Sequence, residues 1–310
     1  MHKKSTFSKN KFHKYDHNIL WNILKKRKIN AIINLRKEVI HMSDTFNSIC
    51  ITSVTNTVCE LFGIETDGNI AGSNPVLTSL AKKKLGNEKI ERAVLYNPDA
   101  VALWLYQKYT DMFTEAAINS DLALPMYSVM PSVTPVCFAS MYTGVQPEIH
   151  GIRKYEKPVL TQKTLFDYFI ENGKKCAIVS TARDSISMIF LEREMDYFIY
   201  DTPEEVNEKA HTLIDEDNYD LIVIYNGNYD GTMHKHGPEA EESMNALRHN
   251  IKAYSDFAEQ INTKWKNHNV LYGFMPDHGC HEIDGECGSH GLDMEEDMNI
   301  IHFYKLKKRL

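Results

Sequence analysis

Acidic and histidine side chains follow three apolar segments of this sequence, at the points where strands are expected to end. The segments AVLYNP, LIVIYNGNY and VLYGFMP run into an Asp, an Asp-x-x-x-His pair and an Asp-His pair, and a further histidine lies in GSHG. The six residues are Asp99, Asp230, His234, Asp277, His278 and His290. A single acidic residue after a strand is usually a turn or cap residue. Three strands that bring carboxylates and imidazoles to one edge of a sheet instead indicate a binding site.

Carboxylate and imidazole ligands in this mixture suit zinc or another divalent first-row metal. One ion needs three or four protein ligands. Six candidates therefore predict two ions, for which we favour Zn²⁺ and keep Mn²⁺ as an alternative. Two ions about 3.5–4 Å apart can hold both the attacking and the leaving oxygen of an in-line displacement at phosphorus. The sequence therefore predicts a two-metal site for a small phosphorylated substrate.

Thr134 opens the segment TPVCFASMYTG, which is typical of a short helix. Thr134 is predicted as the N-cap, Pro135 suits the first helical position, and Gly144 ends the helix. The same hydroxyl would face the anion site that exists at any helix N-terminus. A threonine is a poor nucleophile near neutral pH, and metal coordination can activate it. We therefore predict Thr134 as the nucleophile and as a ligand of one ion.

With these residues in order, the chain resembles the alkaline phosphatase superfamily, and most closely its type I phosphodiesterase/nucleotide pyrophosphatase branch. TPVCFASMYTGVQPEIHGI resembles the nucleophile segment, and YDGTMHKHGP, MPDHG and GSHG resemble the later ligand motifs. NPDA stands where the first Asp of the branch follows the opening strand. The resemblance covers residues 91–306 and includes no formylglycine motif of a sulfatase.

The resemblance implies how the ligands divide between the two ions. One ion is held by Asp230, His234 and His290, and the other by Asp99, Asp277 and His278, beside Thr134. It also implies a covalent phosphothreonine intermediate, later hydrolysed by water, with a backbone amide after Thr134 stabilising the developing charge. The branch has an Asn three residues after the nucleophile, where this chain has Cys137, whose thiol is a weak donor.

The sequence leaves the substrate open. Phosphodiester or pyrophosphate hydrolysis is the favoured activity. A phosphomonoesterase or a phosphonate hydrolase could use the same core. A catalytically inactive metal-binding protein is the remaining alternative.

Strands and helices alternate along most of the chain. Strands are expected at 91–97, 175–181, 195–200, 220–226, 270–275 and 300–306, and helices at 46–62, 76–85, 102–113, 164–173, 202–215 and 238–265. This alternation predicts an α/β fold with a mostly parallel central sheet and helices on both faces, as in alkaline phosphatase. Residues 42–310 are expected to form one catalytic domain.

Charge is distributed unevenly over the 310 residues. The chain has a net charge of −7, although residues 1–41 hold eleven Lys/Arg against Asp16 and Glu38. We interpret residues 1–41 as a disordered extension, or as translated sequence upstream of a start at Met42. The remaining chain is acidic, which argues against nucleic-acid binding.

Apolar runs and cysteine spacing bear on the location of the protein. No apolar run is long enough to span a membrane, and no secretion signal follows the basic start. The six cysteines lack a framework spacing. These features predict a cytoplasmic protein without a membrane partner, and the oligomeric state stays open.

Overall fold

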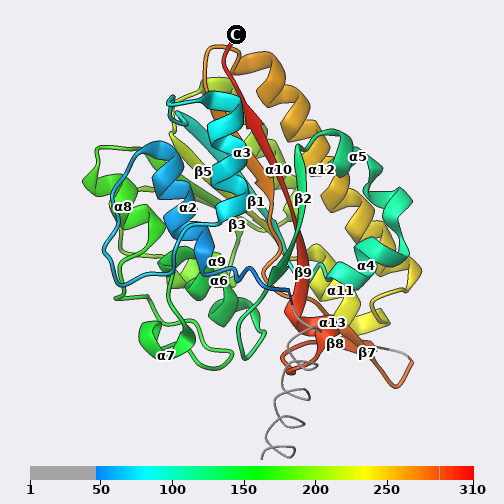
Figure 1. Cartoon of the computed structure of the whole chain (residues 1–310). Helices are drawn as coiled ribbons and strands as arrows, with labels where there is room; N and C mark the ends of the chain where they lie inside the picture. The colour runs from blue at the N-terminus through cyan, green and yellow to red at the C-terminus, as the bar shows by residue number, and fades with distance from the viewer. Residues whose placement is uncertain (1–46, 286) are drawn as a thin grey trace, which may run out of the picture. The chain divides into compact units, whose positions relative to one another are not determined.

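A computed structural model describes residues 47–285 and 287–310 of the chain, and the interpretation of residues 1–41 and Met42 lies outside them. The described residues contain a seven-stranded sheet with strand order β2-β9-β6-β1-β5-β3-β4 (Figure 1). In that order, the strands are Leu122–Tyr127, Asn299–Lys307, Val270–Phe274, Arg92–Pro98, Leu221–Asn226, Cys176–Thr181 and Asp196–Tyr200. Only β9 runs against its two neighbours, so the sheet is mostly parallel, as predicted. A separate hairpin pairs β7 (His281–Ile283) with β8 (Cys287–Ser289).

Helices cover both faces of the sheet (Figure 1). One face carries α2 (Ser53–Phe62), α3 (Pro75–Leu85), α6 (Thr134–Thr143), α8 (Leu165–Glu171) and α9 (Ser185–Ile189). The other carries α4 (Leu103–Lys108), α5 (Thr114–Ile118), α10 (Pro203–Glu216), α11 (Asn228–His236) and α12 (Glu241–Lys264). In β1, Ala93 and Leu95 pack into the first core while Val94 and Tyr96 pack into the second. Such strands are apolar on both faces, which explains the continuous apolar runs in the sequence.

Most predicted elements are confirmed to within three residues at either end. The predicted strands correspond to β1, β3, β4, β5, β6 and β9, and four of the predicted helices to α3, α8, α10 and α12. At the start of α10, the Thr202 side chain accepts from the Glu205 amide and Pro203 is the first helical residue, as predicted. Two short helices, α7 (Pro147–His150) and α13 (Glu295–Met298), and a 3₁₀ turn at Thr110–Phe113 complete the described elements.

Two predicted helices are wrong in extent. The helix expected at 46–62 begins only at Ser53, because Cys50 and Ile51 pair with Tyr127 at the edge of the sheet. The helix expected at 102–113 stops at Lys108 and continues as a 3₁₀ turn, since Tyr109 leaves the helical backbone region. Strand β2 was not predicted, and it contains Pro125, which sheets tolerate on an edge strand.

The predicted role of Thr134 as an N-cap is also wrong. Val133 occupies the cap position with an extended backbone, and Thr134 is the first helical residue of α6. Pro135 is therefore the second helical residue rather than the first. Gly144 ends the helix in the left-handed conformation, as predicted. The Thr134 hydroxyl instead bonds Asp99 and His278, which lie outside the helix.

Three adjacent strands at the centre of the sheet position the residues that could do chemistry. Strand β1 pairs in parallel with both β5 and β6, so the three carboxyl ends lie side by side. β1 leads into Asp99, β5 leads into α11, and β6 leads into Asp277 and His278. The Asp99 amide donates to the Asn226 carbonyl at 3.0 Å, which ties the first two ends together.

Candidate two-metal site

The six Asp and His residues singled out in the sequence form two clusters in the structure. The buried group consists of Asp99, Asp277 and His278, and the open group of Asp230, His234 and His290. Within each group, one ligand atom from every residue lies within 4.8 Å of the others. The rings of His278 and His290 stack with centroids 3.9 Å apart, so the two groups are neighbours.

The buried group is shielded from solvent and lies at the ends of β1 and β6. His278 Nε2 is 3.3 Å from Asp99 Oδ1 and 3.4 Å from Asp277 Oδ2. All three side chains are at most 1% exposed. Two acids and one imidazole thus converge with their side chains shielded from bulk solvent.

The open group combines α11 with the segment after β8. Asp230 and His234 are four residues apart on α11, which places them on one helix face. Asp230 Oδ1 is 3.3 Å from the Nε2 atoms of both His234 and His290. His234 is exposed, while Asp230 and His290 are half-buried. This group therefore faces solvent.

All three imidazoles are oriented in the same way. Each ring uses Nδ1 to donate to a backbone carbonyl: His278 to Gly279 at 2.9 Å, His234 to Gly288 at 3.0 Å and His290 to Ser132 at 2.9 Å. The Nε2 atoms are thereby directed at the carboxylates. Anchoring one ring nitrogen on a carbonyl is how proteins orient histidines that bind metals through the other nitrogen.

The carboxylates supply acceptors that the protein itself leaves unpaired. In the buried group, Asp99 Oδ1 and both carboxylate oxygens of Asp277 have no hydrogen-bond partner among the described residues, whereas Asp230 Oδ1 of the open group lies 3.3 Å from two imidazole nitrogens. An unpaired buried carboxylate costs considerable free energy unless a cation compensates it. The donor set of each group, with carboxylate oxygens and imidazole nitrogens, suits a divalent first-row ion. The residues present therefore fit two metal ions.

The pKa values of the buried group also indicate that the protein does not compensate the charges of its two acids. Burial, followed by the charge of Asp230, raises the pKa of Asp99 to about 7. Burial and then Asp99 raise the pKa of Asp277 well above its usual value. Burial also holds the pKa of His278 well below the ordinary value for histidine. These acids stay ionised only with a cation nearby.

The open group, in contrast, compensates its own charge. Burial opposes ionisation of Asp230, but its interactions with His234 and His290 outweigh it and hold the pKa of Asp230 below its usual value. The interaction with Asp230 raises the pKa of His234 to about 9. For His290, burial lowers the pKa and the interaction with Asp230 outweighs it.

Thr134 lies directly against the buried group. Its Oγ1 is 3.3 Å from Asp99 Oδ2, to which it donates, and 3.2 Å from His278 Nε2. The side chain is 3% exposed. The hydroxyl at the start of α6 is therefore within reach of any ion that these two residues hold.

Several supporting residues were not predicted from the sequence. Tyr225, near the end of β5, donates its hydroxyl to Asp99 Oδ2, and Ser128 donates to the Asp277 carbonyl at 2.6 Å. Asp297 accepts from the Leu292 amide at 2.8 Å and pairs with His281 at 2.7 Å, which braces the segment that carries His290. Tyr225 and Ser128 resemble ordinary core residues in sequence. The only available signal was the position of Tyr225 near the end of a predicted strand, and Ser128, which follows the unpredicted β2, had none.

Two glycines let the segments that carry the two groups pack closely against their neighbours. A Cβ at Gly279 would lie 2.0 Å from the Glu296 carbonyl oxygen, and one at Gly288 would lie 2.3 Å from the Met233 sulfur. The glycine of the Asp-His-Gly motif is thus needed because no side chain fits between its loop and α13.

Cys137 is a buried residue of α6, the helix that begins at Thr134. It is fully buried, and its Sγ is 3.2 Å from the Ser128 hydroxyl. Burial raises the pKa of the Cys137 thiol well above its usual value, so the side chain stays a neutral thiol. Cys137 thus contacts Ser128, which in turn donates to the Asp277 carbonyl, and its neutral thiol is only a weak donor.

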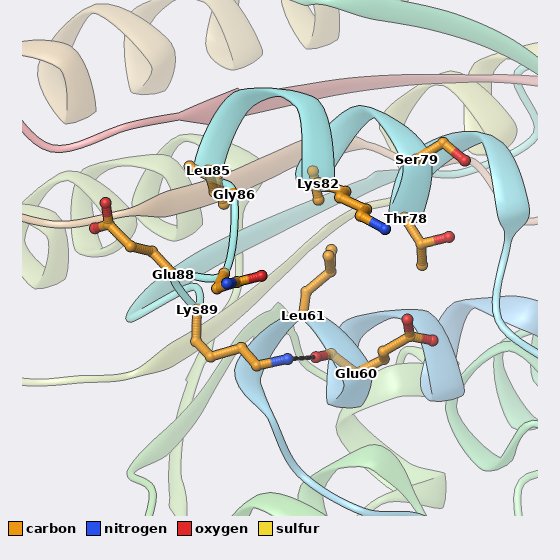
Figure 2. A pocket seen from close by; sticks show the side chains of 11 residues that line it. Glu60, Leu61, Thr78, Ser79, Lys82, Leu85, Gly86, Glu88 and Lys89 are labelled. Atoms are coloured by element: carbon orange, nitrogen blue, oxygen red, sulfur yellow. Dashed lines mark hydrogen bonds between the residues drawn. The ribbon is translucent and has the colours of Figure 1, made fainter.

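A pocket of about 490 Å³ lies away from these groups, where α2, α3 and the segment before β1 meet (Figure 2). In Figure 2, Lys89 extends to the Glu60 carbonyl, and its Nζ donates to that oxygen at 3.2 Å. This pocket precedes the amino end of β1, whereas Asp99 follows its carboxyl end. None of its lining residues belongs to either group.

No helix within residues 47–285 and 287–310 is both long and apolar enough to cross a membrane.

Comparison with known families confirms the resemblance that the motifs indicated. Residues 99–168 match the family model for type I phosphodiesterase/nucleotide pyrophosphatase. This segment holds Asp99, Thr134 and Cys137. The matching family consists of phosphoester-hydrolysing enzymes, which is the class predicted from the motifs. No curated protein matches the sequence.

Comparison with solved structures concerns the fold. Human ectonucleotide pyrophosphatase/phosphodiesterase 5 has a TM-score of 0.50 and 13% identity, covering 61% of this chain and 57% of that chain. The murine protein of that name, in complex with AMP, has a TM-score of 0.49 and 15% identity, covering 62% and 57%. Phosphonoacetate hydrolase from Sinorhizobium meliloti 1021, in complex with phosphonoformate, has a TM-score of 0.47 and 17% identity, covering 63% of this chain and 59% of that chain. This chain thus matches less than two thirds of each structure, and the first likeness shows the predicted alkaline phosphatase-like fold.

Proposed function

We propose that the protein hydrolyses phosphoric esters, with phosphodiester or pyrophosphate bonds as the favoured substrates, through Thr134 and two bound divalent ions. The observation that carries the proposal is the position of Thr134 Oγ1, within 3.3 Å of both Asp99 Oδ2 and His278 Nε2. A hydroxyl placed against a metal-binding group at the start of a helix suits attack on an anionic substrate. The family match over residues 99–168 supports the same reaction class.

Each group has its own role in this proposal. The buried group, Asp99, Asp277 and His278, would hold the ion beside Thr134. The open group, Asp230, His234 and His290, would hold the ion on the solvent side, where the substrate enters. When bound, the two ions lower the pKa of the nucleophile and offset the negative charge that develops at phosphorus. Zn²⁺ suits the mixed carboxylate and imidazole donors, with Mn²⁺ as the alternative.

The residues of the chain account for the bonds and protons of the reaction. Thr134 Oγ1 donates to Asp99 Oδ2, so its proton leaves toward that carboxylate as the Oγ1–phosphorus bond forms. The bond from phosphorus to the leaving oxygen breaks, and the alcohol or phosphate departs with a proton from water. The hydroxide left from that water then attacks phosphorus, the Oγ1–phosphorus bond breaks, and Asp99 returns the proton to Oγ1, which releases the phosphate product and restores the hydroxyl.

The predicted backbone amide after Thr134 does not take part, because residue 135 is proline and has no N–H. The amides of Val136 and Cys137 both donate to the Val133 carbonyl at 3.0 Å. Stabilisation of the developing charge would therefore come from the ions that the two groups hold.

Replacement of the nucleophile tests the proposal. Purified protein loaded with Zn²⁺ or Mn²⁺ should hydrolyse bis-p-nitrophenyl phosphate, and Thr134→Ala should lower kcat by roughly 10³-fold or more. Metal content should stay at two ions in Thr134→Ala, because six other ligands remain. Thr134→Ser keeps a hydroxyl at the same position and is the matched control, with partial activity expected.

The outcomes separate the alternatives that the sequence left open. Full activity of Thr134→Ala would exclude Thr134 as the nucleophile. Faster turnover of a monoester or of a phosphonate would assign the protein to those substrates on the same core. Two bound ions without turnover of any of these esters would indicate an inactive metal-binding protein. The proposal also includes a small phosphorylated molecule as the substrate and the cytoplasm as the location of the protein.

A further inference from the structure

The carboxylate of Asp99 is held by a buried phenol. Tyr225 lies near the end of β5, is 4% exposed, and donates its hydroxyl to Asp99 Oδ2. Thr134 Oγ1 donates to the same oxygen at 3.3 Å. The other oxygen, Asp99 Oδ1, has no hydrogen-bond partner and lies 3.3 Å from His278 Nε2. Hydrogen bonds from the protein thus occupy Oδ2 of Asp99, and Oδ1 is directed at the ligand atoms of the buried group.

Gly227 provides the space that the phenol needs. A Cβ at position 227 would lie 2.8 Å from the Tyr225 hydroxyl oxygen and 3.3 Å from two ring carbons. The φ of Gly227 is −96°, which any residue can adopt, so the backbone does not require glycine here. The requirement comes from the Tyr225 side chain, and a methyl group at 227 would push the hydroxyl away from Asp99.

We propose that Tyr225 is a positioning residue for the ion of the buried group: its hydroxyl fixes the carboxylate of Asp99 so that Oδ1 points to the ion, and Gly227 keeps the phenol in place. This inference rests on the proposed function, since it assumes an ion between Asp99, Asp277 and His278. Partners that orient a ligating group contribute to metal affinity without touching the metal.

The effect is confined to one of the two ions. Asp230 of the open group is held by His234 and His290 rather than by a phenol. Loss of the Tyr225 hydroxyl therefore leaves the open group with its contacts intact. Asp99 alone gains rotational freedom, and its Oδ2 loses its buried phenolic donor.

Metal titration of the metal-free protein tests the inference. Zn²⁺ is titrated by competition with a chelator into wild type, Tyr225→Phe, Gly227→Ala and the double variant, and His234→Gln identifies the ion of the open group. Tyr225→Phe should weaken binding of the other ion by roughly 10- to 100-fold and leave the ion of the open group unchanged. Tyr254→Phe is the matched control, because it removes a buried hydroxyl that bonds Ser120 and contacts neither group.

The double variant tests the link between the two residues. Gly227→Ala should weaken the same ion as Tyr225→Phe, since the added methyl displaces the phenol. In the Tyr225→Phe background, the same glycine substitution should have a much smaller effect, because the atom at 2.8 Å has gone. Strictly additive effects of the two substitutions would overturn the coupling.

The results distinguish this inference from the proposed function. Wild type that binds no ion would contradict the proposed function itself. Wild type that binds two ions, with both affinities unchanged in Tyr225→Phe, would overturn the role of Tyr225 alone. Equal weakening of both ions, together with lower stability than Tyr254→Phe in urea, would assign Tyr225 a structural role and overturn the inference as well.

Discussion

The two Asp/His groups use the same ligand types, yet they differ in burial, in supporting elements and in charge balance. The buried group follows strands β1 and β6, and its side chains are at most 1% exposed. The open group combines α11 with the segment after the β7–β8 hairpin, and its His234 side chain is 43% exposed. The buried group holds two acids against one imidazole, whereas the open group holds one acid against two.

This difference indicates that the two groups suit different roles in the proposed reaction. The central sheet fixes the buried group, and α6, which packs on that sheet, holds Thr134 beside it, as the proposed in-line attack requires. The open group lies on elements outside the sheet and in contact with solvent, which suits binding of an incoming substrate and release of the leaving group. Its two histidines can also neutralise Asp230 without an ion, while the buried acids cannot be neutralised in this way.

The largest expected effects come from removing one carboxylate charge from each group. Asp277→Asn and Asp230→Asn should each lose one ion and lower kcat by roughly 10³-fold or more, since both ions serve the same displacement. Stability of the metal-free protein should change in opposite directions. Asp277→Asn removes an uncompensated buried acid and should raise the free energy of unfolding by about 1–2 kcal/mol. Asp230→Asn removes an acid that two histidines compensate, and should lower it.

Urea unfolding of chelator-treated proteins and metal analysis of loaded proteins measure these effects. Equal destabilisation by both substitutions would contradict the difference in charge balance between the groups. Retention of two ions by Asp277→Asn would exclude the buried group as a metal site.

Glycines beside the two groups provide a second comparison. Gly279 follows His278, and a Cβ there would lie 2.0 Å from the Glu296 carbonyl oxygen and 2.9 Å from the Ala102 Cβ. Gly279→Ala should therefore lower the free energy of unfolding by about 3 kcal/mol or more, because backbone must move to relieve the overlap. Gly231 follows Asp230 on α11, and a Cβ there would meet nothing within 4 Å.

Gly231→Ala is the matched control for Gly279→Ala. It should raise stability by about 0.5–1 kcal/mol, as expected for alanine in a helix interior. Thermal or urea unfolding of the two variants measures both effects. A tolerated Gly279→Ala would show that the loop after β6 is free to move, which would contradict the rigid character of the buried group.

The parts of this architecture that follow from local sequence pattern could be predicted. Apolar runs buried on both faces marked β1, β5 and β6, and the polar residues after them meet at one edge because the strands are parallel. Helix α11 was not predicted, since Gly231 in its interior weakens its helical pattern. Strand β2 was missed because Pro125 interrupts its apolar run. Its pairing with β9 links distant parts of the chain.

Features that depend on the direction of a single side chain could not be predicted. Threonine is a common N-cap residue, but the cap of α6 is Val133, one residue before Thr134. The Thr134 hydroxyl is turned toward Asp99 instead. Tyr225 is indistinguishable in sequence from the other aromatic residues of the core. Only the structure shows that its hydroxyl meets Asp99. The roles of the six Asp and His residues as metal ligands stay a prediction until metal binding is measured.

The smallest expected effect concerns the protonation of the open group in the metal-free protein. Asp230 raises the pKa of His234 to about 9, above the value of about 6.5 for an unfolded chain. The folded state therefore binds this proton more tightly than the unfolded state does. The resulting stabilisation is fully present below about pH 6.5 and is lost as the pH rises through about 9. Because His234 is partly exposed, screening limits the effect to about 1 kcal/mol.

Urea unfolding of chelator-treated wild type and His234→Gln between pH 6.5 and 9 measures this effect. Wild type should lose up to about 1 kcal/mol relative to His234→Gln across this range. His236→Gln, at an exposed position on the same helix, should behave as wild type does. Parallel pH profiles for wild type and His234→Gln would show that Asp230 does not stabilise the protonated form of His234. A metal ion that binds His234 must displace the same proton, so metal binding at the open group is expected to tighten as the pH rises. Parallel profiles would contradict this expectation as well.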